Sequence, residues 1–355
     1  MRYIGNKTRL LDFIRRVLDA RGIRSGTAVD PFTGTASVAR ALKRWGFHVI
    51  AADLMEFSHV FAHAYVQADA PPDFTALAPI LRPHPPTLAG AIAYLNHLGP
   101  EPGFIHEHFS PAGAEGQRHE RMFFTPENAA HIDHIRATIE RWRRERLIGD
   151  DAYYLLLTAT IEAADRVANT AGVYAACIKS WQPNARRALH LRPPRITPGP
   201  TSRATRADAV ELVRDLAPFD LLYIDPPYNE RQYPAYYHIP ELIAIGWFDG
   251  PVELRGKTGL LHDADKRSEW SSRRRCADAL EALVASADCR HIVMSYNSEG
   301  LIPEQTIERI FKNYGRAATY RRYTRTYRRY RSDTDSQRRH YRGNEVVELL
   351  FCVDR

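Results

Sequence analysis

The segment between residues 27 and 54 constrains the fold more than any other feature of this sequence. Short apolar runs at 27–30 and 48–53 have the length and composition of buried strands, and residues 37–45 between them are typical of a helix. A strand, a crossover helix and a second strand form half of a parallel α/β unit. The sequence therefore predicts a parallel sheet covered by helices.

Further strands of this sheet are expected much later in the chain. Apolar runs that suit buried strands occur at 220–225, 291–296 and 345–353. Between the two groups, residues 67–200 are rich in proline and histidine, with helices expected at 126–147 and 151–168. We therefore expect a discontinuous catalytic domain, residues 1–66 and 201–355, interrupted by a mostly helical lobe at 67–200.

Composition excludes several classes of protein. A chain of 355 residues with 44% hydrophobic and 26% charged residues can bury a full α/β core, and no apolar run approaches the roughly 20 residues of a membrane span. Four scattered cysteines indicate neither a disulfide framework nor a zinc site, so no metal is expected. Without a signal-peptide pattern at the N-terminus, the expected location is the cytoplasm. The net charge of +7 suits a polyanionic partner.

The turn after the first strand is a candidate ligand loop. Gly34 lies where the backbone passes the carboxyl edge of a parallel sheet, the edge at which α/β proteins bind cofactors. Asp53 ends the next strand and could bind ribose hydroxyls, as acids do in nucleotide-binding folds. Its alternative role is that of a helix N-cap.

The sharpest motif is the tetrapeptide Asp225-Pro226-Pro227-Tyr228, which leaves the strand expected at 220–225. Two prolines fix the backbone there. A reaction that such a rigid carboxylate site could serve is methylation of an adenine N6 amine. This amine is a poor nucleophile that becomes transiently cationic on methylation, so it needs hydrogen-bond acceptors more than a strong base. Asp225 and the Pro226 carbonyl fit those roles, and Tyr228 can stack on a base rotated out of the duplex. The alternative is a proline-stiffened strand exit with a surface aspartate.

With these motifs, the sequence resembles the Dam-like family of N6-adenine-specific DNA methyltransferases, especially restriction-modification adenine methylases. The resemblance implies a Rossmann-like, seven-stranded class I methyltransferase sheet that uses S-adenosylmethionine. It also implies a set of cofactor-binding residues: Tyr3, Lys7, Asp30, Phe32, Gly34, Thr35, Asp53 and Asp208. The family usually has Phe-x-Gly-x-Gly in its cofactor loop, whereas this chain has Thr35-Ala36 in place of the second glycine.

Two segments are candidates for DNA contact. Within the inserted lobe, residues 169–174 with Lys179 resemble the segment through which family members approach DNA, and Tyr174 is part of it. An ordinary helix-to-loop junction is the alternative. Residues 316–342 contain ten arginines and five tyrosines, which suits phosphate contact beside an aromatic surface. We expect a basic DNA-contacting hairpin at 316–344 rather than a helix, with phosphate contacts from Arg325, Arg328, Arg329 and Arg331.

The predicted function is site-specific methylation of adenine N6 in double-stranded DNA. The enzyme is expected either in a restriction-modification system, with a cognate restriction endonuclease as a further partner, or in an orphan methylation system. An RNA N6-adenine methyltransferase is the first alternative, because the tetrapeptide can serve any unpaired adenine. An N4-cytosine enzyme ranks below it, since that activity more often has serine in place of Asp225. A catalytically silent nucleic-acid-binding module is the alternative from outside the enzymes.

Overall fold

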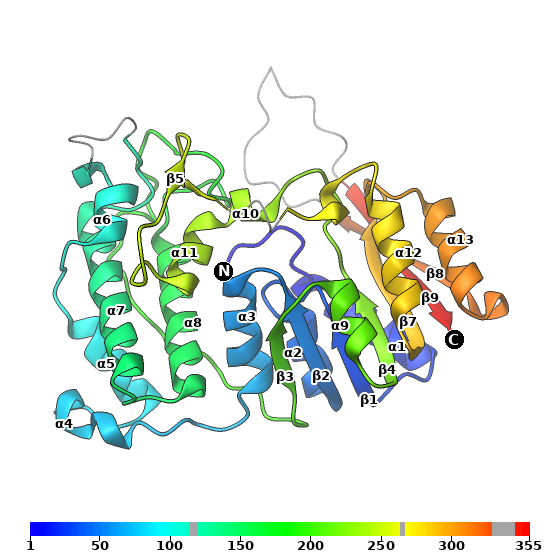
Figure 1. Cartoon of the computed structure of the whole chain (residues 1–355), viewed down its shortest axis with the longest axis horizontal. Helices are drawn as coiled ribbons and strands as arrows, with labels where there is room; N and C mark the ends of the chain where they lie inside the picture. Colours follow the sequence, from blue (N-terminus) through cyan, green and yellow to red (C-terminus); the bar gives the residue numbers. More distant parts are fainter. Residues whose placement is uncertain (114–119, 263–266, 329–344) are drawn as a thin grey trace. The chain divides into compact units, whose positions relative to one another are not determined.

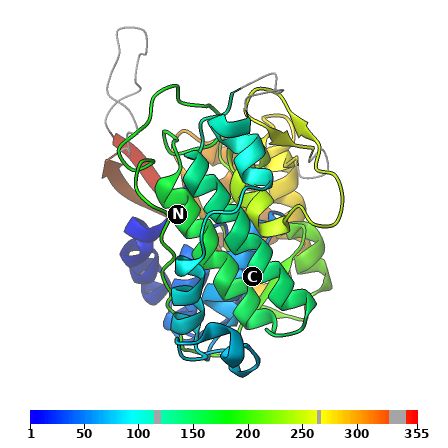
Figure 2. The ribbon, with the colours of Figure 1, turned by 90° about the vertical axis from the view of Figure 1, so that its left-hand side faces the viewer.

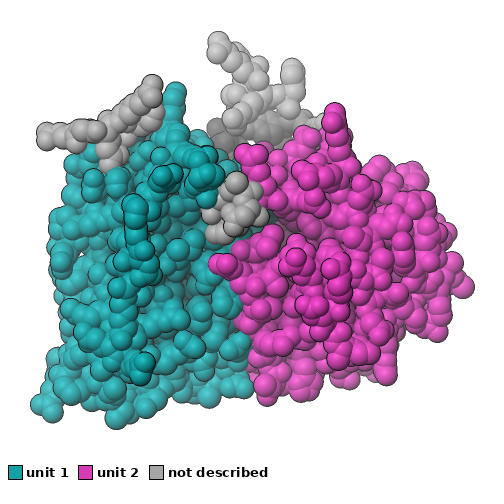
Figure 3. Space-filling model, viewed as in Figure 1, with its two compact units in different colours: residues 1–4, 55–197, 233–264 teal, residues 5–54, 198–232, 265–355 magenta. Residues whose placement is uncertain are grey.

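The computed structural model describes residues 1–113, 120–262, 267–328 and 345–355, and the chain forms two compact units (Figure 3). Unit 1 contains residues 1–4, 55–197 and 233–264, and unit 2 contains residues 5–54, 198–232 and 265–355. Each unit is therefore assembled from three separate stretches of the chain.

Unit 2 is built on a seven-stranded sheet with the order β3-β2-β1-β4-β7-β9-β8 (Figure 1). Its strands are β1 (Gly26–Asp30), β2 (Phe47–Asp53), β3 (Arg203–Arg206), β4 (Phe219–Ile224), β7 (Cys289–Asn297), β8 (Arg321–Arg328) and β9 (Glu345–Asp354). Strands β1, β2, β3, β4 and β7 are mutually parallel, whereas β9 runs antiparallel to both β7 and β8. The prediction of a Rossmann-like, seven-stranded α/β sheet is confirmed.

Helices cover both faces of this sheet. They are α1 (Leu11–Ala20), α2 (Ser37–Arg44), α9 (Ala209–Asp215), α12 (Cys276–Ser286) and α13 (Glu304–Tyr314), with short 3-10 turns at Thr8–Leu10, Glu269–Ser271 and Ala317–Thr319. Helices α9, α12 and α13 pack on one face through a continuous apolar core, and α1 and α2 lie on the other (Figure 1). Two faces result because the right-handed crossovers run from β1 to β2 in one direction along the strand order, and from β3 to β4 and on to β7 in the other.

The order of the strands determines where a ligand can bind. Strands β1 and β4 are neighbours, and the order runs away from this pair in both directions. The connections that follow these two strands therefore diverge, and the carboxyl edge at such a point is where open α/β sheets bind ligands. Asp30 and Asp225 stand at these two strand ends.

Unit 1 is mainly helical, and its long helices α7 and α8 face the viewer in Figure 2. Its helices are α3 (Glu56–Ala62), which continues as a π-helical turn (His63–Gln67), α4 (Ala78–Leu81), α5 (Leu88–His97), α6 (Phe104–Phe109), α7 (Pro126–Arg144), α8 (Asp150–Val167), α10 (Tyr233–Tyr236) and α11 (His238–Ile245), with 3-10 turns at Thr75–Leu77 and Pro111–Gly113 and a small hairpin of β5 (Leu254–Arg255) and β6 (Leu260–Leu261). The Thr125 side chain caps α7 by accepting a hydrogen bond from the Asn128 amide.

The segment 233–264 belongs to unit 1, although the sequence places it in the catalytic domain. Helix α11 is almost fully buried, and it packs against α3 and α8. The buried Glu241 carboxylate accepts hydrogen bonds from the amides of Glu56 and Phe57, both at 3.0 Å. These two amides begin α3 and lack partners within that helix, so Glu241 supplies a cap from a distant part of the chain.

Within the described ranges, no helix is both long and apolar enough to span a membrane. Nor do those ranges contain a group of three or more histidine, cysteine, aspartate or glutamate side chains arranged to hold a metal ion.

Candidate active site

The tetrapeptide 225–228 lies where β4 leaves the sheet. Residues Leu221 to Ile224 are fully buried, and parallel pairing with β1 and β7 holds this end of the strand from both sides. The Asp225 side chain is 16% exposed, so its carboxylate is largely shielded but still reachable. The main chain after Tyr228 is also fixed, because the Tyr228 carbonyl accepts a hydrogen bond from the Leu301 amide at 3.2 Å.

Lys7 lies directly against this tetrapeptide. Its ammonium nitrogen is 3.1 Å from Oδ1 of Asp225 and 5.4 Å from the centre of the Tyr228 ring. The Lys7 side chain is only 3% exposed. The sequence associates Lys7 with the cofactor, but the structure places its charge beside the carboxylate proposed to act on the target base.

Glu348 is a member of the same cluster that the sequence analysis missed. Its Oε2 atom lies 3.9 Å from the Lys7 ammonium nitrogen, and its side chain is 13% exposed. Glu348 is on β9, opposite Asn297 of β7 and Arg325 of β8. The available signal was an acid within the otherwise apolar run 346–353, where a carboxylate needs a buried partner.

The charges of this cluster shift one another's pKa values. Burial raises the pKa of Asp225 to about 6, with Lys7 opposing the rise and Glu348 adding to it. Burial also raises the pKa of Glu348, again against the effect of Lys7. For Lys7, burial acts to lower the pKa, but Asp225 and Glu348 outweigh it and the net shift is upward. Lys7 is therefore a stable cation between two carboxylates.

The candidate cofactor loop is held between the ends of β1 and β2. Oδ2 of Asp53 accepts a hydrogen bond from the Gly34 amide at 3.0 Å, and the Thr33 amide donates to the Ala52 carbonyl at 2.9 Å. Helix α3 has Met55 as its N-cap, so Asp53 does not serve as the helix cap considered from sequence. Asn6 reaches the same loop, donating from its amide to Oγ1 of Thr35 at 3.1 Å.

Ala36 takes the place of the second loop glycine that the resemblance leads one to expect. Its backbone is left-handed, with φ 58° and ψ 23°, and Gly34 has φ 51°. The side chain of Ala36 is fully buried. The loop therefore keeps a conformation that suits glycine, and alanine adopts it at an energetic cost.

Asp30 is buried at the end of β1, with 2% exposure. Burial and the nearby carboxylates of Asp225 and Asp53 raise its pKa well above the ordinary value. Phe32 follows in the loop, with its ring edge against Trp270 at a centroid distance of 4.8 Å. The structure thus gathers most of the predicted cofactor residues at one edge of the unit 2 sheet.

Two predicted cofactor residues have other contacts. Asp208 is the N-cap of α9, where its carboxylate accepts from the amides of Val210 and Glu211 at 2.8 and 3.3 Å. Tyr3 belongs to unit 1, and its ring stacks on Tyr237 at 4.8 Å.

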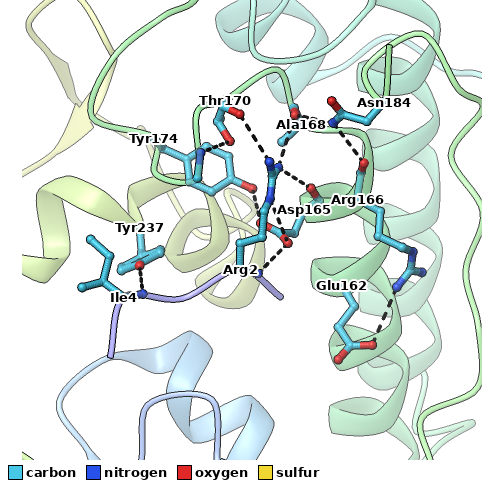
Figure 4. Close-up of polar contacts among 11 residues, drawn as sticks. Arg2, Ile4, Glu162, Asp165, Arg166, Ala168, Thr170, Tyr174, Asn184 and Tyr237 are labelled. Carbon is cyan, nitrogen blue, oxygen red and sulfur yellow. Dashed lines mark hydrogen bonds and ion pairs between the residues drawn. The ribbon is translucent and has the colours of Figure 1, made fainter. Parts of the chain in front are cut away.

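The segment 169–174 is tied firmly into unit 1 (Figure 4). The Arg2 side chain donates to main-chain carbonyls at the end of α8 and just beyond it, namely those of Asp165, Ala168 and Thr170. Tyr174 is 1% exposed, and its hydroxyl lies 3.5 Å from Oδ1 of Asp165. A DNA contact by Tyr174 would require this ring to leave the interior, whereas Lys179 is exposed.

The predicted basic hairpin is described in part. Residues 321–328 form β8, so a strand and not a helix is found there. Arg325 is half-buried on this strand. The side chain of Arg328 and the whole of Arg329 and Arg331 lie outside the described residues.

An exposed arginine loop, residues 178–195, was missed as a candidate DNA contact. It presents Arg186, Arg187, Arg192 and Arg195 to solvent. Asparagines from unit 1 helices hold its backbone. Asn128 donates to the Arg187 carbonyl at 2.9 Å and accepts from the Leu189 amide at 2.8 Å. Asn96 donates to the carbonyl of Leu191 and accepts from the amide of the same residue. The available signal was the absence of any acid between residues 166 and 207.

A sheet of this strand order, with one antiparallel strand and a carboxylate cluster at its carboxyl edge, defines a class I methyltransferase. A sequence model of the family described as D12 class N6 adenine-specific DNA methyltransferase matches residues 3–310. The chain belongs to this family. The resemblance found in the sequence is confirmed.

Characterised relatives match along the whole chain. Type II methyltransferase M.FokI of Planomicrobium okeanokoites is 34% identical over 100% of this chain and 53% of its own length. Type II methyltransferase M.NlaIII of Neisseria lactamica is 33% identical over 100% of this chain and 99% of its own length. Modification methylase StsI of Streptococcus sanguinis is 31% identical, with 52% of its length covered. The chain thus spans about half of two of these relatives and nearly all of the third.

Proposed function

We propose that this chain transfers a methyl group from S-adenosylmethionine to adenine N6 in double-stranded DNA at a specific sequence. The observation that carries the proposal is the Asp225 carboxylate at the exit of β4, with Oδ1 held 3.1 Å from the buried Lys7 ammonium. The ion pair thereby orients Asp225 through Oδ1, and we assign Oδ2 to the target amine. A preorganised acceptor of this kind stabilises charge that develops only in the transition state.

In this mechanism the protein orients the amine and handles its proton. Oδ2 of Asp225 and the Pro226 carbonyl accept the two N–H bonds of the adenine amine, and Tyr228 stacks on the flipped base. The bound cofactor supplies a methyl group on a sulfonium with a good leaving group. The N–C bond would form as the bond between sulfur and the methyl group breaks, which leaves a neutral thioether and a cationic amine. One proton of that amine passes to Asp225. A carboxyl group with a pKa of about 6 is ionised at neutral pH and can accept it.

The residues at the carboxyl edge fit S-adenosylmethionine. The ammonium and sulfonium groups of the cofactor are cations. Burial, together with Asp225 and Asp53, raises the pKa of Asp30. A cation bound nearby would favour the ionised form of these acids. Within the described ranges, the buried Thr33 hydroxyl in the loop has no hydrogen-bond partner, which leaves it available to a ligand oxygen. Asp53 at the end of β2 suits the ribose hydroxyls.

Exposed arginines support contact with the DNA backbone from unit 1. The arginine loop carries no acid. Its main chain is fixed by Asn96 and Asn128, so the backbone of the loop need not become ordered when DNA binds. Such cations contact phosphates and position the duplex without reading its sequence. Arg325 of β8 remains a proposed contact of the same kind.

The printed names of the relatives support a place in a restriction-modification system. M.FokI and M.NlaIII are type II methyltransferases, and StsI is a modification methylase. We therefore propose that the chain protects DNA against a cognate restriction endonuclease, which is its second partner.

One assay tests the main proposal. The protein is incubated with radiolabelled S-adenosylmethionine and either duplex DNA or RNA, and methylated positions in the DNA are then mapped by sequencing. The expected result is label on duplex DNA alone, at adenine N6, within one short sequence. Label on RNA or at cytosine N4 would favour those alternative activities, and cofactor binding without transfer would indicate a silent module.

A further inference from the structure

Lys7 creates a difficulty for the proposed chemistry. An ammonium at 3.1 Å from Asp225 neutralises the carboxylate, and a neutral pair offers little electrostatic stabilisation to an amine that becomes cationic. Burial makes this worse, because charges shielded from water interact more strongly. If Lys7 and Asp225 were alone, the residue that orients the carboxylate would also cancel it.

Glu348 resolves this difficulty by its charge. It provides a second carboxylate 3.9 Å from the same ammonium, and both acids are largely buried. The cluster of one cation and two carboxylates therefore carries a net negative charge. Lys7 can then hold Oδ1 of Asp225 while the site as a whole still attracts a cation.

Glu348 is also held rigidly. Strand β9 pairs on one side with β7 and on the other with β8, and Glu348 stands opposite Asn297 and Arg325 in these two ladders. Lys7 precedes the short helical turn Thr8–Leu10, and its carbonyl accepts from the Leu10 amide at 2.8 Å. Hydrogen bonds thus hold the main chain of both residues in place, so only their side chains are free to move.

We propose that Glu348 is a positioning residue for methyl transfer, which holds Lys7 between two carboxylates so that Lys7 orients Asp225 without cancelling its charge. This inference rests on the proposed function. Glu348 lies beyond residues 3–310 that the family model matches, so the assignment comes from the fold of this chain.

The first test is the pH dependence of single-turnover methyl transfer by Glu348→Gln. The titratable groups around Asp225 are Lys7, Glu348, Tyr223 and Tyr228, with Asp30 on β1. The carboxylate form of Asp225 is required, so the wild-type rate should fall as the pH falls below about 6. Removing the charge of Glu348 lowers the pKa of Asp225. The acid limb of the pH–rate profile, where the rate falls with falling pH, should therefore move to lower pH. The plateau rate should drop about 10-fold to 100-fold, with KM for DNA nearly unchanged.

This combination separates a positioning role from a structural one. A variant that is slower only because it is less stable keeps its acid limb in place and loses thermal stability, and that result would overturn the proposal. Glu348→Asp should recover part of the plateau rate and return the acid limb toward the wild-type position. Glu308→Gln is the matched control, since Glu308 is a surface residue of α13 paired with Lys312.

A second measurement does not depend on activity. In protein labelled with 15N at lysine side chains, a buried ammonium exchanges its protons slowly, and the Lys7 signal can be assigned by its loss in Lys7→Arg. Glu348→Gln should shift this signal and speed its exchange, and an unchanged signal would overturn the proposal. If wild-type protein methylates no duplex DNA, the proposed function fails, while the Lys7 signal still shows whether Glu348 holds that ammonium.

Discussion

The carboxyl edge of the unit 2 sheet and the arginine loop of unit 1 handle charge in opposite ways. At the sheet edge, Lys7 is 3% exposed and lies between two carboxylates. In the arginine loop, Arg186, Arg187 and Arg192 are exposed, and no acid is present in the segment 166–207. Buried, compensated charges shift pKa values and fix geometry, whereas exposed, uncompensated ones attract a polyanion and respond to salt. Substitutions at the sheet edge should therefore change the rate of methyl transfer, and substitutions in the arginine loop should change the affinity for DNA and its response to salt.

The largest effect is expected at the sheet edge. Asp225→Asn keeps the shape of the side chain but removes its charge, and it should slow methyl transfer about 10²-fold to 10³-fold because the developing cation loses its acceptor. Affinity for S-adenosylmethionine, measured by calorimetry, should stay near the wild-type value. Asp278→Asn, at an exposed position of α12, is the control. A near wild-type transfer rate would show that the tetrapeptide is not catalytic.

The arginine loop should show the opposite response. Replacing Arg186, Arg187 and Arg192 by alanine should weaken binding to cognate and unrelated duplexes alike, because arginines that bind phosphates carry no sequence information. The slope of log affinity against log salt should flatten by about 0.9 for each phosphate that the variant no longer neutralises. The rate at saturating DNA should not change. Arg141→Ala, at an exposed position of α7, is the control, and an unaltered slope in the triple variant would remove this loop from the DNA interface.

A smaller effect is expected from the two aspartates assigned to the cofactor. Asp53→Ala should weaken S-adenosylmethionine binding about 10-fold, since it removes a charged hydrogen-bond acceptor. Asp208→Ala should instead cost about 1 kcal/mol of stability, because Asp208 caps α9. Calorimetry and thermal unfolding of both variants separate the roles. Unchanged affinity in Asp53→Ala would assign Asp53 a structural role, in which its carboxylate holds the loop amide of Gly34.

The smallest effect concerns the strained loop. Ala36 has φ 58°, so Ala36→Gly should relieve strain and raise the free energy of unfolding by up to about 1 kcal/mol, less the entropy that glycine gains in the unfolded chain. Ala39→Gly, within α2, should instead lower it by about 1 kcal/mol. Denaturant titrations compare the two. An equal decrease in the free energy of unfolding in both variants would mean that the backbone at Ala36 is not strained.

The strands and the tetrapeptide could be predicted because local patterns specify them. The runs 27–30, 48–53 and 220–225 are apolar because both faces of a parallel sheet are buried, and a motif that directly follows such a strand must stand at its carboxyl edge. The two long helices of unit 1 were expected at 126–147 and 151–168 for a similar reason, and they are found at Pro126–Arg144 and Asp150–Val167.

The partners of Lys7 could not be predicted in this way. Lys7, Asp225 and Glu348 are far apart in the sequence. The strand order places β4 and β9 in one sheet, and the N-terminal segment brings Lys7 to them. Tyr174 illustrates the reverse problem, since a tyrosine in a loop gives no local sign of whether it is exposed. Its surroundings come from distant parts of the chain, with Asp165 of α8 near its hydroxyl and the rings of Phe123 and His238 beside its own.

The way the chain alternates between the two units has a consequence for engineering. Six successive stretches, 1–4, 5–54, 55–197, 198–232, 233–264 and 265–355, belong in turn to unit 1 and unit 2. Neither unit can therefore be cut out, expressed or exchanged with a relative as one continuous cassette. Transplanting 55–197 alone would separate α3 from the Glu241 that caps it and α8 from the Arg2 that binds its end. A chimera intended to change the recognised DNA sequence would need all three stretches of unit 1 from the same donor.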